Sequence, residues 1–320
     1  MLVLFYNPLS LSFIVKRGEF MKKIVMISVI VLSFVLSGLA QKTRTVTVTT
    51  APEATVWVDD IKRGTTDETG KLVMKFVAAG TRKVRVRAYS FKETTQNLLP
   101  TQSQLKVNLV KSTDQAELTF HEAEKMMKID RRQAIELYQK AVSLRPKYAE
   151  AYIEMARAMS DAGDNEGALE AIANARKARP VFPEASAVEG RIHKSDGDEE
   201  KAIASFKRAI REGKGFQPEA HTGLGLLYKE KAEGFASAGD FDNETATYKI
   251  AAAELKIALA QLSGTEPVLY ELLGNVYEKM QDFKGAIAIY EEYLKLFPDT
   301  PEATTFRSYI VQIKKQMAEQ

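Results

Sequence analysis

Apolar and polar residues alternate along residues 44–110. The alternating apolar positions are Val46 and Val48; Val56 and Val58; Leu72, Met74 and Phe76; Val84, Val86 and Ala88; and Leu105, Val107 and Leu109. Pro and Gly residues separate these runs. A period of two places successive side chains on opposite faces of a strand, and Pro and Gly mark the turns. The pattern therefore predicts a small antiparallel β-sandwich with one buried and one solvated face.

From Asp114 to Gln320 the period becomes helical, and the pattern repeats every 34 residues. Small and bulky residues recur at this interval: Ala134, Ala168 and Ala202; Tyr138, Ile172 and Phe206; Ala141, Ala175 and Ala209. A repeat of this length indicates paired antiparallel helices that stack on their neighbours. We divide this region into five units, 115–148, 149–182, 183–216, 218–266 and 267–300. The predicted fold is therefore mainly α, a right-handed solenoid preceded by a β domain over 41–113.

Two parts of the array depart from the regular repeat. Gly225 and Gly274 hold equivalent positions but lie 49 residues apart, so the fourth unit (218–266) is too long. We expect this unit to form an extended hairpin that turns near Gly239. After Pro301 an apolar stripe predicts a helix that caps the last unit. Its members are Ala303, Phe306, Ile310, Ile313 and Met317.

Both regions resemble known families. The residues Pro52–Asp59, Gly64–Thr65 and Ala79–Gly80 make the β region similar to PEGA domains, which are small surface or envelope modules. The 34-residue period, with small and aromatic residues at fixed offsets, resembles the tetratricopeptide repeat. The second resemblance implies a non-catalytic scaffold whose first helices line a concave face that binds peptides or protein segments.

The first forty residues have the pattern of a processed leader. Lys22 and Lys23 precede an apolar run that ends near Leu36, and small residues lead to Ala40. This order is typical of a secretory signal peptide, here cleaved after Ala40. A retained signal anchor is the alternative, and it would be the chain's only contact with a membrane. Residues 1–20 precede a second Met, and we expect Met21 to be the true start. The prediction is a free, exported, periplasmic protein and not a lipoprotein.

The charge is divided between the two predicted domains. The whole chain carries a formal charge of +3, but residues 1–40 account for that excess, which leaves 41–320 neutral. The β region carries +7 and residues 114–320 carry −7. A basic β face formed by Lys83, Arg85 and Arg87 is expected to meet an anionic surface, either the array or an envelope polymer. Charged strands that resist aggregation explain the same residues. Export and neutrality argue against nucleic acid as a partner.

The composition excludes much of the chemistry that a chain of this length can carry. The chain has no Cys and only three His, so thiol catalysis, disulfides and Cys-ligated metals are ruled out, and a His-rich metal site is not expected. Two acidic clusters, at Asp161 and Asp164 and at 196–200, fall between paired helices, where Asp caps a helix start. We expect neither an enzyme nor a cofactor.

The predicted binding site is the concave face of the first helices. Counting two helical turns from each unit gives these partner-binding residues: Ile153, Arg157, Ala187, Arg191, Lys194, Thr222, Leu226 and Lys229. Arg157, Arg191 and Lys194 form a basic patch suited to an acidic protein segment. A solvated helix face explains these residues almost as well. The rival function is an envelope-surface or glycan-binding module, in which the basic β face binds and the array is a spacer.

Overall fold

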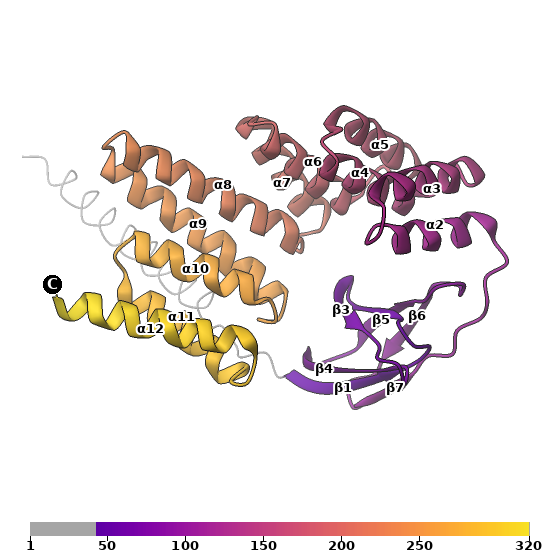
Figure 1. The fold of residues 1–320 in the computed structure, drawn as a ribbon, viewed down its shortest axis with the longest axis horizontal. Helices are drawn as coiled ribbons and strands as arrows, with labels where there is room; N and C mark the ends of the chain where they lie inside the picture. Colours follow the sequence, from indigo (N-terminus) through magenta and orange to yellow (C-terminus); the bar gives the residue numbers. More distant parts are fainter. Residues whose placement is uncertain (1–42, 320) are drawn as a thin grey trace, which may run out of the picture. The chain divides into compact units, whose positions relative to one another are not determined.

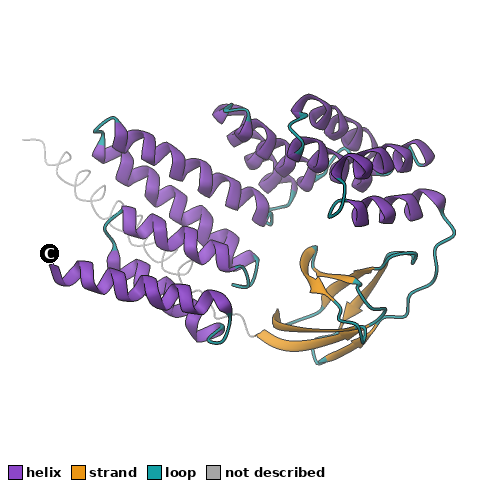
Figure 2. Cartoon of the chain, in the orientation of Figure 1, coloured by secondary structure: helices purple, strands orange, loops and turns teal. Residues whose placement is uncertain are grey.

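The computed structural model describes residues 43–319, and the part from Arg44 onward forms one compact unit. Strands come first in the chain and helices follow, as Figures 1 and 2 show. The prediction of a mainly α protein with an N-terminal β region is therefore confirmed. The leader and the signal peptide predicted over 1–40 lie outside the described residues.

The β domain contains two small sheets. Its strands are β1 (Thr43–Thr49), β2 (Thr55–Val58), β3 (Ile61–Thr65), β4 (Lys71–Ala78), β5 (Arg82–Arg87), β6 (Thr94–Leu98) and β7 (Gln104–Lys106). One sheet has the order β4-β1-β7 and the other β3-β2-β5-β6. Alternate residues of the strands, such as Val46, Val56 and Val86, share one buried core, as a period of two requires.

Two details of the predicted sandwich were wrong. The β1–β7 pair is parallel, with Val48 opposite Leu105, whereas we expected only antiparallel strands. The alternation in β4 also breaks at Phe76, whose φ of 59° shifts the buried position to Val77. Both features depend on pairing with distant strands, which a local alternation does not report.

The array contains paired helices and one final helix. The first helices are α2 (Gln115–Met126), α4 (Ala149–Asp161), α6 (Pro183–Ser195), α8 (Pro218–Ser237) and α10 (Pro267–Lys279). The second helices are α3 (Arg131–Leu144), α5 (Asn165–Ala178), α7 (Glu199–Glu212), α9 (Phe241–Gln261) and α11 (Phe283–Leu296). The chain's last described element is α12 (Pro301–Glu319). No helix within residues 43–319 is both long and apolar enough to cross a membrane.

An aspartate caps the start of each second helix. The side chains of Asp130, Asp164, Asp198, Asp240 and Asp282 accept hydrogen bonds from backbone N–H groups in the first turn of the helix that follows. These bonds satisfy donors that have no partner inside the helix. Asp164 and Asp198, one from each predicted acidic cluster, therefore have a structural role.

Small residues let each first helix approach its neighbours closely. A Cβ added to Gly190 would lie 2.6 Å from Phe206, one on Gly225 2.6 Å from Leu255, and one on Gly274 2.2 Å from Tyr290. Such distances are too short for any real Cβ, so the packed ring or branched side chain requires glycine there. Phe206, Leu255 and Tyr290 therefore occupy equivalent positions in α7, α9 and α11.

The fourth helix pair is longer than the others. The helices α8 and α9 contain 20 and 21 residues, whereas α6 and α7 contain 13 and 14. They lie side by side in Figure 1, with α10 next to α9. At the end of the array, Phe306 of α12 stacks on Tyr290 with 5.2 Å between ring centroids, so α12 covers the last pair.

Candidate functional site

Two of the predicted partner-binding residues are inside the protein. Ile153 is 1% exposed and Ala187 is fully buried, so neither contacts a partner, and their assignment to the binding face is corrected. The half-buried positions of α4 instead include Glu150, Glu154 and Arg157, which follow one another at helical spacing. Ile153 turns toward the neighbouring helices and joins the core that α3, α4 and α5 share.

Arg157 lies at the centre of a cluster that crosses three first helices. Its guanidinium donates two hydrogen bonds to Glu219 of α8, at 2.8 and 2.7 Å, and one to Glu184 of α6 at 3.3 Å. Glu154, one turn earlier in α4, adds a third carboxylate whose charge acts on Arg157. We call Glu154, Arg157, Glu184 and Glu219 the Arg157 cluster. The bidentate contact holds α4 and α8 in register.

Negative charge exceeds positive charge in this cluster. Burial raises the pKa of Glu154 and of Glu184, although Arg157 acts to lower both. Burial also acts to raise the pKa of Glu219, but the two hydrogen bonds and the charge of Arg157 bring it below its usual value. Glu184 keeps 45% of its side-chain surface exposed, so water reaches the cluster. The result is a solvated anionic strip with one cation that is already paired.

The other predicted cations are paired in the same way. Arg191 lies 3.6 Å from Asp161, Lys194 lies 2.6 Å from Glu230, and Lys229 lies 2.7 Å from Glu233. Thr222 donates its hydroxyl to the backbone carbonyl of Pro218, and Leu226 is half-buried. The predicted basic residues thus lie on three first helices, α4, α6 and α8, and each has a carboxylate neighbour.

The three carboxylates of the Arg157 cluster were missed in the sequence. Glu184 and Glu219 each follow a proline at a helix start. The helix dipole stabilises a negative charge there, so an acidic residue at this position needs no binding role to explain it. For Glu184 and Glu219 the available signal was periodicity, since Glu150, Glu184 and Glu219 hold the same place in three successive units; Glu154 has no such signal, because Val188 stands at its place in the next unit.

The basic β face is only partly free. Lys83 is exposed, but Arg87 is 11% exposed and Arg85 is half-buried. Arg87 pairs with Glu93 at 2.7 Å and with Glu124 of α2 at 2.6 Å. Its guanidinium lies between two rings, 5.1 Å from the centroid of Trp57 and 4.8 Å from that of Phe120. Arg87 therefore contacts the first helix of the array instead of facing solvent.

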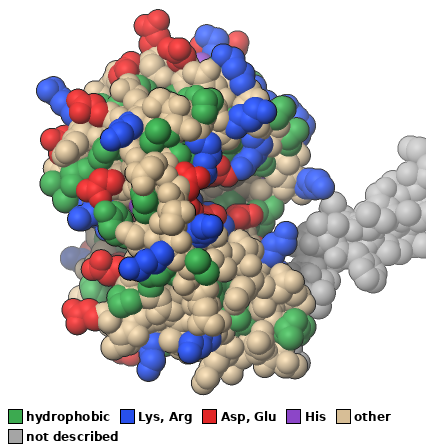
Figure 3. All heavy atoms as spheres, turned by 90° about the vertical axis from the view of Figure 1, so that its right-hand side faces the viewer, with side chains coloured by type: hydrophobic (Ala, Val, Ile, Leu, Met, Phe, Trp, Pro, Cys, Tyr) green, Lys and Arg blue, Asp and Glu red, His purple; other side chains and the backbone are tan. Residues whose placement is uncertain are grey.

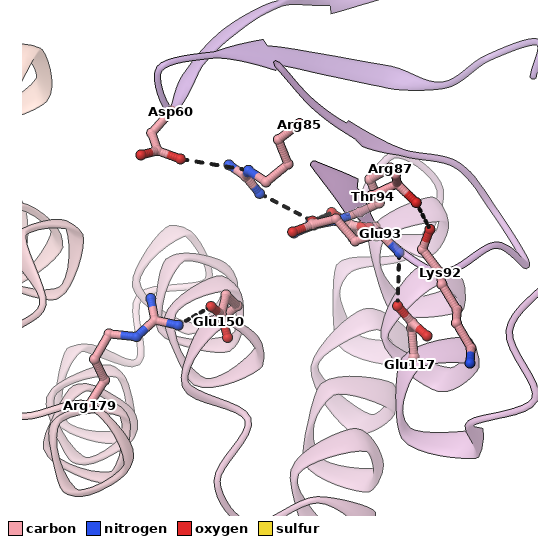
Figure 4. A network of polar contacts seen from close by, with 10 residues as sticks. Asp60, Arg85, Arg87, Lys92, Glu93, Thr94, Glu117, Glu150 and Arg179 are labelled. Atoms are coloured by element: carbon pink, nitrogen blue, oxygen red, sulfur yellow. Dashed lines mark hydrogen bonds and ion pairs between the residues drawn. The ribbon is translucent and has the colours of Figure 1, made fainter. Parts of the chain in front are cut away.

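Further polar contacts join the β domain to α2. Tyr89 donates to Glu122 at 2.8 Å, and Glu117 accepts from the backbone N–H of Glu93 at 3.2 Å and from the hydroxyl of Ser112. Figure 4 shows Arg85 between Asp60 and Glu93, with Glu117 below the Glu93 backbone. Figure 3 shows the side of the molecule that lies at the right in Figure 1. Basic and acidic side chains lie next to one another across its middle. The opposite charges of the two predicted regions thus attract each other where the β domain contacts α2.

No arrangement suited to metal binding occurs in residues 43–319. No group of three or more His, Asp or Glu side chains in this part of the chain could hold an ion. His221 is nearly buried, and its Nδ1 lies 2.6 Å from Glu254 of α9, which links the two helices of the long hairpin. The polar side chains described so far bind one another and position helices.

Three segments of the chain match models of the tetratricopeptide repeat, namely residues 130–192, 184–212 and 267–310. These segments of the array are therefore tetratricopeptide repeats, as the 34-residue period predicted. No curated protein is similar to this chain.

The chain is also similar to solved structures of other proteins. Yeast Tom70 is 17% identical over 64% of this chain and 41% of its own length, with a TM-score of 0.52. A tetratricopeptide protein of Thermus thermophilus is 20% identical over 62% of this chain and 98% of its own, with a TM-score of 0.45. The likeness to Tom70 supports the solenoid fold and no more.

Proposed function

We propose that this chain is a non-catalytic scaffold of the bacterial cell envelope, exported by the signal peptide predicted over 21–40. Its β domain is PEGA-like, and its array binds a segment of a partner protein along the first helices. Tetratricopeptide proteins generally act as protein-interaction scaffolds, and three segments of the array match models of that repeat. The envelope location rests on the leader sequence.

The Arg157 cluster carries this proposal. It forms a polar strip, reached by water, that crosses α4, α6 and α8 in succession. Because its cation is paired while two of its carboxylates have raised pKa values, the strip favours a segment that brings Lys, Arg or backbone N–H donors. This replaces the acidic segment expected from the sequence, since Arg157, Arg191 and Lys194 each have a carboxylate neighbour.

In the rival function the basic β face binds an envelope polymer. Two of its three residues are engaged within the protein: Arg87 by Glu124 and Glu93, and Arg85 by Asp60 and Glu93. Only Lys83 remains exposed. The arrangement therefore supports the array as the binding region and the β domain as a part that is docked on it.

The test is crosslinking and recovery of partners from the native envelope with the full-length protein. Glu184→Gln together with Glu219→Gln removes two negative charges from the strip, and Glu166→Gln together with Glu170→Gln makes the same change on the exposed face of α5. We expect the first pair of changes to abolish recovery of partners that the wild-type protein and the α5 variant retain. A circular dichroism spectrum identical to wild type confirms that the array is intact. Equal recovery with both variants contradicts binding along the Arg157 cluster.

A further inference from the structure

The outward side of α9 is apolar although no described element covers it. Ile250 and Ile257 are 45% and 42% exposed, and small apolar residues lie between and beside them. We call this surface the α9 outer face; its members are Ala246, Ile250, Ala253, Ile257 and Ala260. The opposite side of the same helix, with Tyr248, Leu255 and Leu259, packs in the core. A helix that is apolar on both sides is normally covered on both.

The other second helices show that the fold does not require apolar residues at the positions of Ile250 and Ile257. Because Leu255 is equivalent to Phe206 and Tyr290, Ile257 is equivalent to Arg208 and Glu292, and Ile250 to Lys201 and Gly285. The 34-residue spacing extends the series to Asn174 and Lys140, and to Gly167 and Gln133. At both positions the other four second helices carry a polar residue or glycine. The two isoleucines are therefore specific to α9.

The spacing of the α9 outer face matches a helix-to-helix seam. Its five residues follow one another at intervals of four, three, four and three, with isoleucine and alanine in turn. This is the a/d spacing of a coiled coil, in which each side chain enters a gap in the facing helix. The seam runs for about 20 Å at 1.5 Å per residue, and its alanines permit a close approach. A helix fits this surface better than an extended segment does.

The charges beside the seam select the kind of helix. Lys249 and Lys256 are exposed along one edge, and neither forms an ion pair with another described residue. The ammonium of Lys256 lies 5.2 Å over the ring of Tyr277 of α10. Glu254, two residues from Lys256 in the sequence, contacts His221 instead. A second copy packed antiparallel on this face would place lysine beside lysine, whereas a helix with acidic flanks would pair with both.

We propose that the α9 outer face binds an amphipathic helix of a partner protein whose apolar seam is flanked by Asp or Glu. This site lies on a different surface from the Arg157 cluster and does not depend on the function proposed for it. Burial of Ile250 and Ile257 supplies most of the affinity, and Lys249 and Lys256 set the preference for acidic flanks. A scaffold with both surfaces can hold two partners at once.

The test uses two synthetic helical peptides of the same length as α9, 21 residues. Both have a Leu and Ala seam at a and d positions; one has Glu at the flanking positions and the other has Lys. The full-length protein is titrated with each peptide, and binding is followed by fluorescence anisotropy at low and high salt. We expect the Glu peptide to bind on the order of tenfold more tightly at low salt, with the difference shrinking as salt increases.

Variants of the protein complete the test. Ile250→Gln together with Ile257→Asn copies residues that α3 and α5 carry at these positions, and it should weaken binding roughly tenfold or more. Lys249→Glu together with Lys256→Glu should reverse the preference to the Lys peptide. Equal binding of both peptides, no binding of either, or no effect of the isoleucine changes overturns the proposal. Self-association that the isoleucine changes abolish, measured by sedimentation, also overturns it, because a second copy then occupies the face.

Discussion

The helices α7 and α9 hold the same place in successive units but differ on their exposed sides. Three buried residues of α7, Ala202, Phe206 and Ala209, are matched by the buried Ala251, Leu255 and Ala258 in α9. The residues on the other side do not correspond, since the exposed Lys201 and Arg211 and the half-buried Arg208 are replaced by Ile250, Ala260 and Ile257. Neighbouring helices impose the first set, because each side chain must fit beneath a glycine or alanine. No contact with a described residue explains why Ile250, Ile257 and Ala260 are apolar, so we attribute them to a partner outside the array.

The sharpest way to test this comparison is to change each side of α9 separately. Leu255→Ala removes a fully buried side chain that fills the space beneath Gly225, and it should lower the free energy of unfolding by about 2–4 kcal/mol. Ile257→Asn, two residues away, should change it by less than about 0.5 kcal/mol, because its side chain already faces water. Urea unfolding followed by circular dichroism measures both. Comparable losses would mean that the α9 outer face is part of the core.

The buried half of this comparison could be predicted from the sequence, and much of the site could not. The 34-residue interval from Ala168 to Ala202 indicates a repeated helix pair. Each helix of a pair packs on the next helix in the chain, so periodicity predicts these contacts. Arg157 and Glu219 are 62 residues apart, and their contact depends on how three first helices are rotated. Ile153 was assigned to the wrong side for the same reason, since helical spacing defines a stripe but not the neighbour that covers it.

The β domain shows the same limit. Alternation identifies the faces of its strands, yet Arg87 alternates as an outward residue and still becomes one of the most enclosed charged side chains, because α2 lies against that face. The separation of charge between the two regions was visible in the sequence. The acidic residue that meets Arg87, Glu124, was not, because no local pattern links β5 to α2.

A smaller difference in stability is expected between two glycines of α8. Gly223 lies in the part of α8 that packs as in the other units, and Gly234 lies in the extension of the helix. Gly223 lies under Phe206, where an added Cβ would be 2.3 Å from the ring, whereas nothing lies within 4 Å of a Cβ at Gly234. Gly223→Ala should therefore destabilise the protein by about 1–3 kcal/mol. Gly234→Ala should stabilise it by about 0.5–1 kcal/mol, because alanine loses less backbone freedom in a helix. Thermal unfolding of the two variants checks the opposite signs, and a loss at Gly234 would show that another surface packs on the extension.

The smallest expected effect on the free energy of unfolding comes from comparing equivalent positions of the first helices α4 and α6. Glu154 of α4 stands where α6 has the buried Val188, which explains why burial raises its pKa. A carboxyl with a raised pKa in the folded state binds its proton more tightly there than in the unfolded chain. Its ionised form therefore costs stability above the folded pKa, and the cost disappears below the unfolded value.

Glu154→Gln should accordingly raise the free energy of unfolding at neutral pH, and the gain should vanish below about pH 4, where the wild-type carboxyl is protonated in both states. Glu170→Gln, an exposed change on α5, provides the matched control and should show no such dependence. Urea unfolding of the three proteins between about pH 3 and pH 8 measures the difference. A loss of stability at neutral pH would mean instead that attraction to Arg157 outweighs the burial of Glu154, and that the cluster binds its own charges more strongly than a donor from a partner would.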